Sequence, residues 1–333
     1  MTEEHDKGKQ LFFDTITIYL ITAEFLFCIV GTLLIIPHLF ITTRKSMRTS
    51  STNSLIIGIS LCDLLVIIGS INPFSLFAEQ SCSNPMSYFY TIEYHLTKIL
   101  IDTCTRSSYY LGLSLAVIRL LIIMFPTSSK LEHLSKPSIG YYVAVSMVLL
   151  NFLPTANFYL RMNIILREDK WIPEEKCTKF PANYTEETYT YSKLSDFQYA
   201  LYPVLSGGLQ FFACIGHPIA AVLLNLMIRK STKVARRLSC AVLSDRRRTS
   251  KMVLLMTISY AVSSAPMTLN YFLSIVAWSS LVLDLFLGYR VGIFLFFVIN
   301  ASMHCIICFI MSSEYRKTVK RILSVCRRKV KEL

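Results

Sequence analysis

Six ionisable side chains that stand inside long apolar stretches of this 333-residue chain could take part in chemistry. Placing a charged side chain in the middle of a bilayer costs about 3 kcal/mol on insertion scales, so such residues usually face a protein interior and mark functional positions. The six are Glu24, Asp63, Lys98, Asp102, Arg106 and Arg119.

Lys98, Asp102 and Arg106 recur at intervals of four residues, so on a helix they share one face. They could form a mutually paired ladder that allows the helix to be buried. They could equally form the wall of a ligand pocket, because perturbed charges mark both structural networks and binding sites.

Seven apolar stretches position these groups, and each is long enough to cross a bilayer as a helix. They cover residues 15–41, 53–77, 91–124, 138–159, 199–228, 251–277 and 284–311. Alternation with a period of two, which a membrane β-barrel would need, is missing from these stretches. We therefore predict an all-α integral membrane protein, with an extracellular segment at 1–14, a seven-transmembrane helix bundle at 15–311 and an amphipathic helix with a cytosolic tail at 312–333.

The composition and the charge support this organisation. Hydrophobic residues make up 53% of the chain and charged residues only 17%, and seven spans leave no room for a large soluble domain. The first, third and fifth connections and the tail together hold 22 basic residues against four acidic ones. Basic residues collect on the cytosolic side, so we expect a multi-pass plasma-membrane protein with its N-terminus outside. The net charge of +13 is then a topology signal, and no nucleic-acid partner is expected.

Two positions outside the spans are candidates for modification. Asn183-Tyr184-Thr185 is a glycosylation acceptor in the fourth connection, on the predicted outer side. After residue 312, apolar residues follow helical spacing among many basic ones, which is typical of a helix lying on the anionic inner leaflet. Cys326 in that helix is a candidate for palmitoylation, although an unmodified buried thiol fits equally well.

Strings in the second, third and seventh spans resemble those of rhodopsin-like G-protein-coupled receptors. Asp63 follows Asn53 at the family's spacing, and Arg119 precedes Pro126 by the family's interval. The segment 300–317 resembles the nematode serpentine receptors of class W, which are similar to FMRFamide-type neuropeptide receptors. Two motifs depart from the wider family: Ile118 and Leu120 flank Arg119, and His304, Cys305 and Cys308 replace Asn, Pro and Tyr.

This resemblance implies an activation network of Asp63, Ser108, Asn300 and His304. The first three align with a buried sodium site, and a carboxylate with neutral oxygens suits a small hard cation. Ordered water would suit the same polar groups, and a positive charge on His304 would weaken sodium binding. We expect no other cofactor or metal.

The resemblance also implies an external disulfide, which here would join Cys82 to Cys177. The family's first cysteine position is held by Tyr94, and Cys82 lies further out in its loop, so two free or separately paired cysteines remain an alternative.

The function implied is a receptor that passes an extracellular signal to a heterotrimeric G protein. A ligand would contact Asp102, Arg106, Lys98 and Glu24. The coupling surface would include Arg119, Pro126 and the basic loop from Arg229 to Lys251. The ligand class is a short neuropeptide, with an environmental small molecule as the alternative.

Other functional classes fit less well. Transporters tend to show internal repeats, and channels need rings of charge or a filter segment, and neither pattern is visible. Asp63 has no second carboxylate for an aspartyl dyad, and no Gly-x-Ser-x-Gly or His-Glu-x-x-His motif is present, so we do not expect an enzyme.

Overall fold

The computed structural model describes residues 2–71, 87–125, 133–173, 180–181, 183–192, 196–238, 241–276 and 280–332. Within its helices, the side chains of residues 2–14, 17, 196–200, 232–238, 241–247, 270, 272–276, 280–291 and 325–332 are not described. In chain order the elements are α1 (Thr2–Thr42), α2 (Ser51–Ser70), α4 (Tyr88–Met124), η1 (His133–Ser135), α6 (Pro137–Tyr159), β1 (Ile164–Leu166), β2 (Tyr189–Tyr191), α7 (Asp196–Leu238), α8 (Ala241–Val276), α9 (Ser280–Met311) and α10 (Ser313–Glu332).

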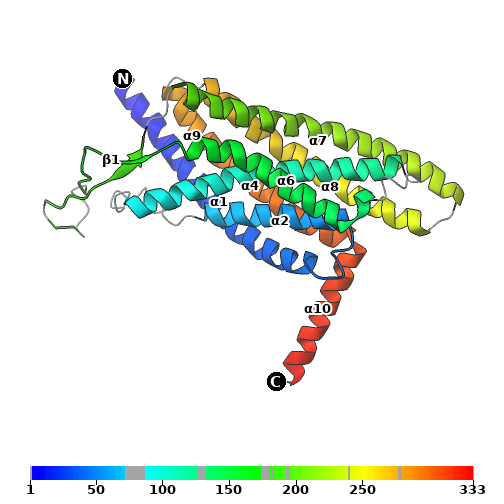
Figure 1. The fold of residues 1–333 in the computed structure, drawn as a ribbon. Helices are drawn as coiled ribbons and strands as arrows, with labels where there is room; N and C mark the ends of the chain where they lie inside the picture. Colours follow the sequence, from blue (N-terminus) through cyan, green and yellow to red (C-terminus); the bar gives the residue numbers. More distant parts are fainter. Residues whose placement is uncertain are drawn as a thin grey trace.

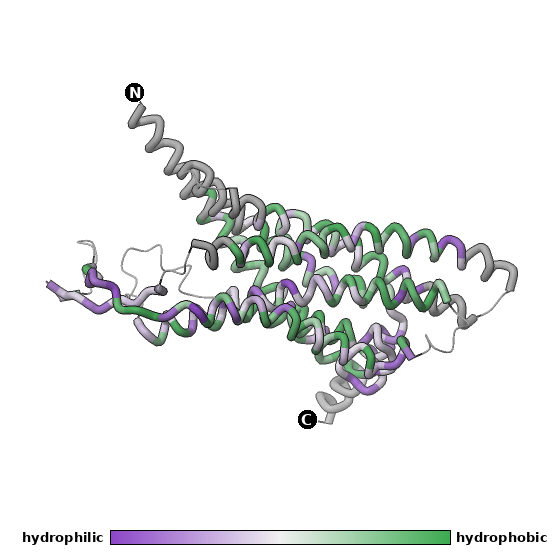
Figure 2. Tube along the Cα trace, turned by 45° about the horizontal axis from the view of Figure 1, so that its top comes forward, coloured by the Kyte–Doolittle hydropathy of each residue, from purple (hydrophilic) through white to green (hydrophobic). Residues whose placement is uncertain are grey.

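Seven of these helices are long and apolar enough to cross a membrane, which confirms the predicted bundle. The spans are Ile18–Thr42, Ser51–Ser70, Tyr88–Met124, Pro137–Tyr159, Leu201–Ser231, Arg248–Leu269 and Gly292–Met311. Figure 2 shows hydrophobic residues running along these helices and mostly hydrophilic ones in the connection between β1 and β2. The chain is therefore a multi-pass membrane protein.

The outward faces of the helices are apolar, as lipid contact requires. Leu149 and Leu153 on α6, and Phe212 and Val222 on α7, are exposed although they stand in the middle of their helices. The bundle interior holds a different set of side chains, in which apolar residues such as Leu55 are mixed with buried polar and charged ones. Lipid covers the outside, and the polar groups find partners within the protein.

Helix α4 is the central element, since it contacts α2, α6, α7 and α8. Its start is set by Ser87, whose hydroxyl accepts a hydrogen bond from the backbone N–H of Tyr90 at 3.3 Å. Helix α2 begins in the same way, with Ser50 accepting from Asn53 N–H at 3.4 Å. Serine caps of this kind satisfy amide groups that the first helical turn leaves without partners.

Helix α2 ends earlier than its apolar stretch, which extends to residue 77. Its last residue is Ser70, and the N–H of Ile71 closes the final turn on the carbonyls of Ile67 and Ile68. Pro73 follows shortly after, and a residue before proline is disfavoured in the helical conformation. The apolar stretch therefore overestimates the length of this helix.

The two ends of the bundle carry different elements (Figure 1). At one end stands the hairpin, in which β1 pairs antiparallel with β2 and Ile165 lies opposite Thr190. From the other end α10 departs at an angle to α9. The Arg316 guanidinium donates to the carbonyls of Phe309 at 3.1 Å and Ile310 at 2.5 Å, so it caps the last turn of α9.

Helix α10 is also attached to the first helix and to the connection that follows it. The Tyr315 hydroxyl lies 3.0 Å from His38 Nδ1, and Ser46 Oγ lies 3.3 Å from Thr318 Oγ1. Burial raises the pKa of Tyr315, so its hydroxyl stays protonated and available as a donor. These contacts fix where the amphipathic helix leaves the bundle.

Candidate functional site

Arg106 is a fully buried guanidinium in the middle of α4, only 1% exposed. One terminal nitrogen donates to the hydroxyls of Tyr202 at 3.3 Å and Ser206 at 3.2 Å, both on α7. The other donates to the backbone carbonyl of Asn151 on α6 at 3.3 Å and to the Thr155 hydroxyl. Hydrogen bonds from two neighbouring helices thus replace the water that a buried cation loses.

Asp102 stands one turn above Arg106 and is half-buried. Its Oδ2 atom accepts hydrogen bonds from Tyr159 of α6 at 2.8 Å and from Tyr202 of α7 at 2.9 Å. The Tyr202 hydroxyl therefore donates to the carboxylate and accepts from the guanidinium, and it connects the two charged groups. We call Asp102, Arg106, Tyr159 and Tyr202 the outer polar cluster.

The other two predicted ligand residues stand further from this cluster. Lys98 is half-buried, and its ammonium lies 5.2 Å from the centre of the Tyr94 ring, within range of a cation–π contact. Glu24 is half-buried on α1, which packs against α2 and α9, whereas the cluster is built between α4, α6 and α7. The four residues thus do not form one group: Asp102 and Arg106 are linked through Tyr202, and Glu24 belongs to another side of the bundle.

The hairpin is attached to α4 just above the cluster. The Tyr191 hydroxyl donates to the Thr91 carbonyl at 2.6 Å, and the Tyr191 ring lies 4.8 Å from that of His95. His95 Nε2 in turn donates to the carbonyl of Tyr159 at 2.7 Å. Burial raises the pKa of Tyr191 to about 12, with smaller contributions from Tyr94 and Tyr90, so this donor keeps its proton at neutral pH.

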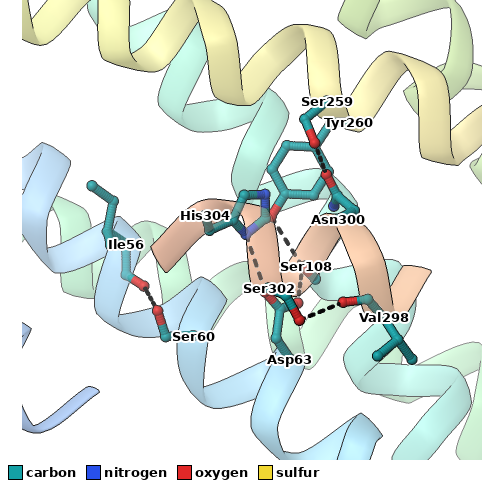
Figure 3. A network of polar contacts seen from close by, with 10 residues as sticks. All are labelled: Ile56, Ser60, Asp63, Ser108, Ser259, Tyr260, Val298, Asn300, Ser302 and His304. Atoms are coloured by element: carbon teal, nitrogen blue, oxygen red, sulfur yellow. Dashed lines mark hydrogen bonds and ion pairs between the residues drawn. The ribbon is translucent and has the colours of Figure 1, made fainter. Parts of the chain in front are cut away.

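A second group of polar side chains lies deeper in the bundle and surrounds Asp63 of α2 (Figure 3). Asp63 and His304 are each 1% exposed, and Oδ2 of the carboxylate lies 3.2 Å from Nδ1 of the imidazole. Its Oδ1 atom accepts from the Ser108 hydroxyl of α4 at 2.6 Å. Three helices, α2, α4 and α9, therefore meet at one carboxylate.

Tyr260 of α8 joins the same group. Its hydroxyl lies 3.1 Å from Ser108 Oγ, and its ring lies 4.6 Å from that of His304 and stacks at 5.0 Å on His217 of α7. A Cβ atom at Gly112 would overlap the Tyr260 ring, so glycine is required there for the ring to approach α4. We call Asp63, Ser108, His304 and Tyr260 the inner polar network.

Asn300 takes a different partner from the one that the resemblance implies. Its Oδ1 atom accepts from the Ser259 hydroxyl of α8 at 2.5 Å, as Figure 3 shows. The structure thus brings Asp63, Ser108 and His304 together and places Asn300 in a neighbouring α8–α9 contact. In the part of the chain that the structure describes, no group of three or more His, Cys, Asp or Glu side chains could hold a metal ion.

The predicted coupling residues lie toward the other end of the helices. Arg119 is half-buried five residues before the end of α4, and Arg229 and Lys251 are exposed on α7 and α8. Asn183 is exposed in the connection between β1 and β2. Pro126, Cys82, Cys177 and the side chain of Cys326 lie outside the described residues.

Several residues of both sites were not predicted from the sequence. They are the partners on α6, α7 and α8: Asn151, Thr155, Tyr159, Tyr202, Ser206, His217 and Tyr260. A usable signal exists, because Asn151, Thr155 and Tyr159 recur every four residues on a mostly apolar helix, although Asn151 binds Arg106 only through its backbone carbonyl. Tyrosine counts as hydrophobic in a composition, so this spacing is easily overlooked.

Comparison with known proteins agrees with this architecture. No curated protein matches the chain. The sequence model of one family, described as serpentine type seven-transmembrane G-protein-coupled chemoreceptor Srw, matches residues 22–326, which cover the first span from its fifth residue, the other six spans in full and the start of α10. The chain therefore belongs to the Srw family of serpentine seven-transmembrane G-protein-coupled chemoreceptors.

Proposed function

We propose that this receptor detects a short peptide in the outer half of its bundle and signals through a heterotrimeric G protein from the plasma membrane. The observation that carries the proposal is the outer polar cluster. Asp102 is partly accessible, two tyrosine hydroxyls donate hydrogen bonds to it, and a buried guanidinium stands one turn below. Maintaining charged side chains at this depth is unfavourable, and a ligand site is a common reason for it.

The chemistry of the cluster favours a ligand with a cationic or hydrogen-bond-donating group. Asp102 can accept further hydrogen bonds, because a carboxylate has about four acceptor positions and two are filled by tyrosines. A peptide amino terminus or a basic side chain would supply such a donor. An environmental small molecule is the second candidate, since the family is described as chemoreceptors.

The signal would pass through contacts that join helices. The outer polar cluster connects α4 to α6 and α7, and the inner polar network connects α4 to α2, α8 and α9. A ligand that binds one arrangement of these helices more tightly shifts the population toward it. Arg119, Arg229 and Lys251 would then meet the G protein on the cytosolic side, with the N-terminus outside.

A ligand screen in cells that report G-protein activation tests this proposal, with Asp102→Asn as the decisive variant. We expect an active peptide to lose potency by roughly tenfold or more, which corresponds to about 1.4 kcal/mol. Glu93→Gln is the matched control, because Glu93 is an exposed carboxylate on the same helix. Equal dose–response curves for Asp102→Asn and wild type would remove Asp102 from the ligand site.

The coupling half of the proposal is tested separately. Arg119→Gln should abolish the G-protein response while a labelled ligand still binds the cells. A ligand-gated current carried by the purified protein in a planar bilayer would contradict the receptor mechanism and support a channel instead.

A further inference from the structure

The connection between β1 and β2 contains a tight turn with an asparagine at its apex. The Tyr184 N–H donates to the Pro181 carbonyl at 3.1 Å, and Asn183 has a φ of 68°. Some tight turns require a positive φ at the third position, and asparagine is one of the few residues other than glycine that adopt it readily. Asn183 and Thr185 are both exposed and Tyr184 between them is half-buried, so the two side chains that define the acceptor are open to solvent.

Three aromatic side chains in mutual contact, Trp171, Phe180 and Tyr184, accompany this turn. The Phe180 ring lies 5.2 Å from that of Trp171 and 5.0 Å from that of Tyr184. Two backbone hydrogen bonds join Trp171 to Glu186, at 2.9 and 3.2 Å, and the Tyr184 hydroxyl donates to the Glu186 carboxylate at 2.8 Å. Phe180 is only half-buried, so Trp171 and Tyr184 do not enclose the residue completely.

Phe180 stands three residues before the acceptor asparagine and directly before Pro181, the first residue of the turn. A pyranose sugar has an apolar C–H face that packs on aromatic rings, and a sugar attached to the Asn183 side chain can reach only its immediate surroundings. We propose that Asn183 carries an N-linked glycan whose first N-acetylglucosamine packs on Phe180. The glycan thereby stabilises the hairpin that stands at the outer end of α4. This inference goes beyond ligand detection. It requires only one part of the predicted topology, namely that the connection between β1 and β2 faces the lumen of the secretory pathway during synthesis.

The covalent step uses a polyprenyl-pyrophosphate-linked oligosaccharide as donor. Asn183 Nδ2 forms a bond to the anomeric carbon of the first sugar as the bond from that carbon to the pyrophosphate oxygen breaks. The polyprenyl pyrophosphate leaves, and the amide releases one proton. No electrons are transferred, and the product is a neutral, bulky group on the surface of the loop.

The test compares three forms of the purified receptor: fully glycosylated, trimmed to one sugar by endoglycosidase H, and stripped by PNGase F. Endoglycosidase H needs high-mannose glycans, so the protein is produced in cells that make only these. We expect the first two forms to melt together and the stripped form to melt roughly 2 °C lower. In Phe180→Ala all three forms should melt together, because the sugar has lost its partner.

Three control variants distinguish packing of the sugar on Phe180 from a general effect of the glycan or of the substitution. Tyr189→Ala removes an aromatic ring from the same hairpin but outside the turn, and it should keep the difference between the one-sugar and stripped forms. Asn183→Asp reproduces the aspartate that PNGase F leaves, so its melting temperature should equal that of the stripped form. Asn183→Gly keeps the positive φ without an acceptor, and its loss of the glycan band identifies the modified residue.

Each outcome either supports or contradicts the packing of the sugar on Phe180. The inference is wrong if the wild-type protein shows no glycan at Asn183, or if its one-sugar and stripped forms melt at the same temperature. It is equally wrong if Phe180→Ala retains the wild-type difference. None of these measurements uses signalling, so a failure of the proposed receptor mechanism would leave the result unaffected.

Discussion

At the scale of single residues, Tyr202 has the largest number of roles in the outer polar cluster. Its hydroxyl donates to Asp102 and accepts from Arg106, and its ring stacks on Phe158 at 4.1 Å with an angle of 11° between the planes. The ring provides packing and the hydroxyl provides the polar connection. Removing the hydroxyl alone therefore isolates the connection from the packing.

We expect Tyr202→Phe to destabilise the protein by about 1.5–3 kcal/mol, the usual range for a buried hydrogen bond to a charged group. Ligand potency should fall as well, because Asp102 would lose one of its two tyrosine donors. Thermal unfolding in detergent and a dose–response curve measure the two effects. Tyr110→Phe is the control, since it removes a bond to the neutral Leu209 carbonyl. A smaller loss of stability in Tyr202→Phe than in the control would contradict the assignment.

The Asp63–His304 contact leads to a second prediction at this scale. Asp63→Asn and His304→Asn each remove one partner of this buried contact. The loss destabilises the protein by several kcal/mol if the pair is ionised and by less if the pair is neutral. The double variant should be less destabilised than the sum of the two, with a coupling energy of about 1 kcal/mol or more. The free energies of unfolding of wild type, the two single variants and the double variant give this coupling energy. Strict additivity of the two losses of stability would show that the two side chains act independently.

Part of both sites could be predicted at the residue scale. Charged residues in apolar stretches are conspicuous, so Asp63, Asp102 and Arg106 were found without a structure. Their partners were not, because Tyr202 and Tyr260 stand on other helices and look like ordinary core aromatics in the sequence. Which helix faces which is decided by packing between segments far apart in the chain, and the periodicity of one segment does not contain that information.

At the scale of elements, apolar length predicted the helices well and their ends less well. Seven apolar stretches became seven spans, because a helix is the one way to satisfy the backbone in lipid without closing a barrel. Strands β1 and β2 were not predicted. Each has only three residues, too few for an alternating pattern to stand out, and their pairing bridges a connection of more than twenty residues.

The attachment of α10 gives a prediction for this scale. Tyr315→Phe removes the hydroxyl that lies 3.0 Å from His38 Nδ1, which should weaken the docking of α10 by about 1 kcal/mol. Amide hydrogen exchange in residues 313–324 should then become several times faster, while exchange in α2 stays unchanged. Tyr142→Phe serves as the control, because that side chain is 71% exposed on α6. Unchanged exchange in α10 would mean that the apolar face of this helix is sufficient to hold α10 in place, without the Tyr315 hydroxyl.

At the scale of the whole molecule, the asymmetric distribution of basic residues determines the expected orientation. An odd number of spans separates the two ends of the chain, and 22 basic residues fall on one side. Epitope tags at the two termini of the intact protein should therefore differ in accessibility on unpermeabilised cells, with only the N-terminal tag reached by antibody. Equal labelling of both tags would refute seven spans, whatever the receptor binds.

Helix α4 contributes side chains to both polar groups, and this has a mechanical consequence. Asp102 and Ser108 are six residues apart on one uninterrupted helix, about 9 Å along its axis. A helix segment this short is stiff. A rotation or shift of the segment that accommodates a ligand at Asp102 would therefore also move the Ser108 hydroxyl, which donates to Asp63. Under the proposed function, a ligand at Asp102 would therefore act on the inner polar network through this one helix segment, and a substitution that prevents the segment from moving at either residue should abolish the response.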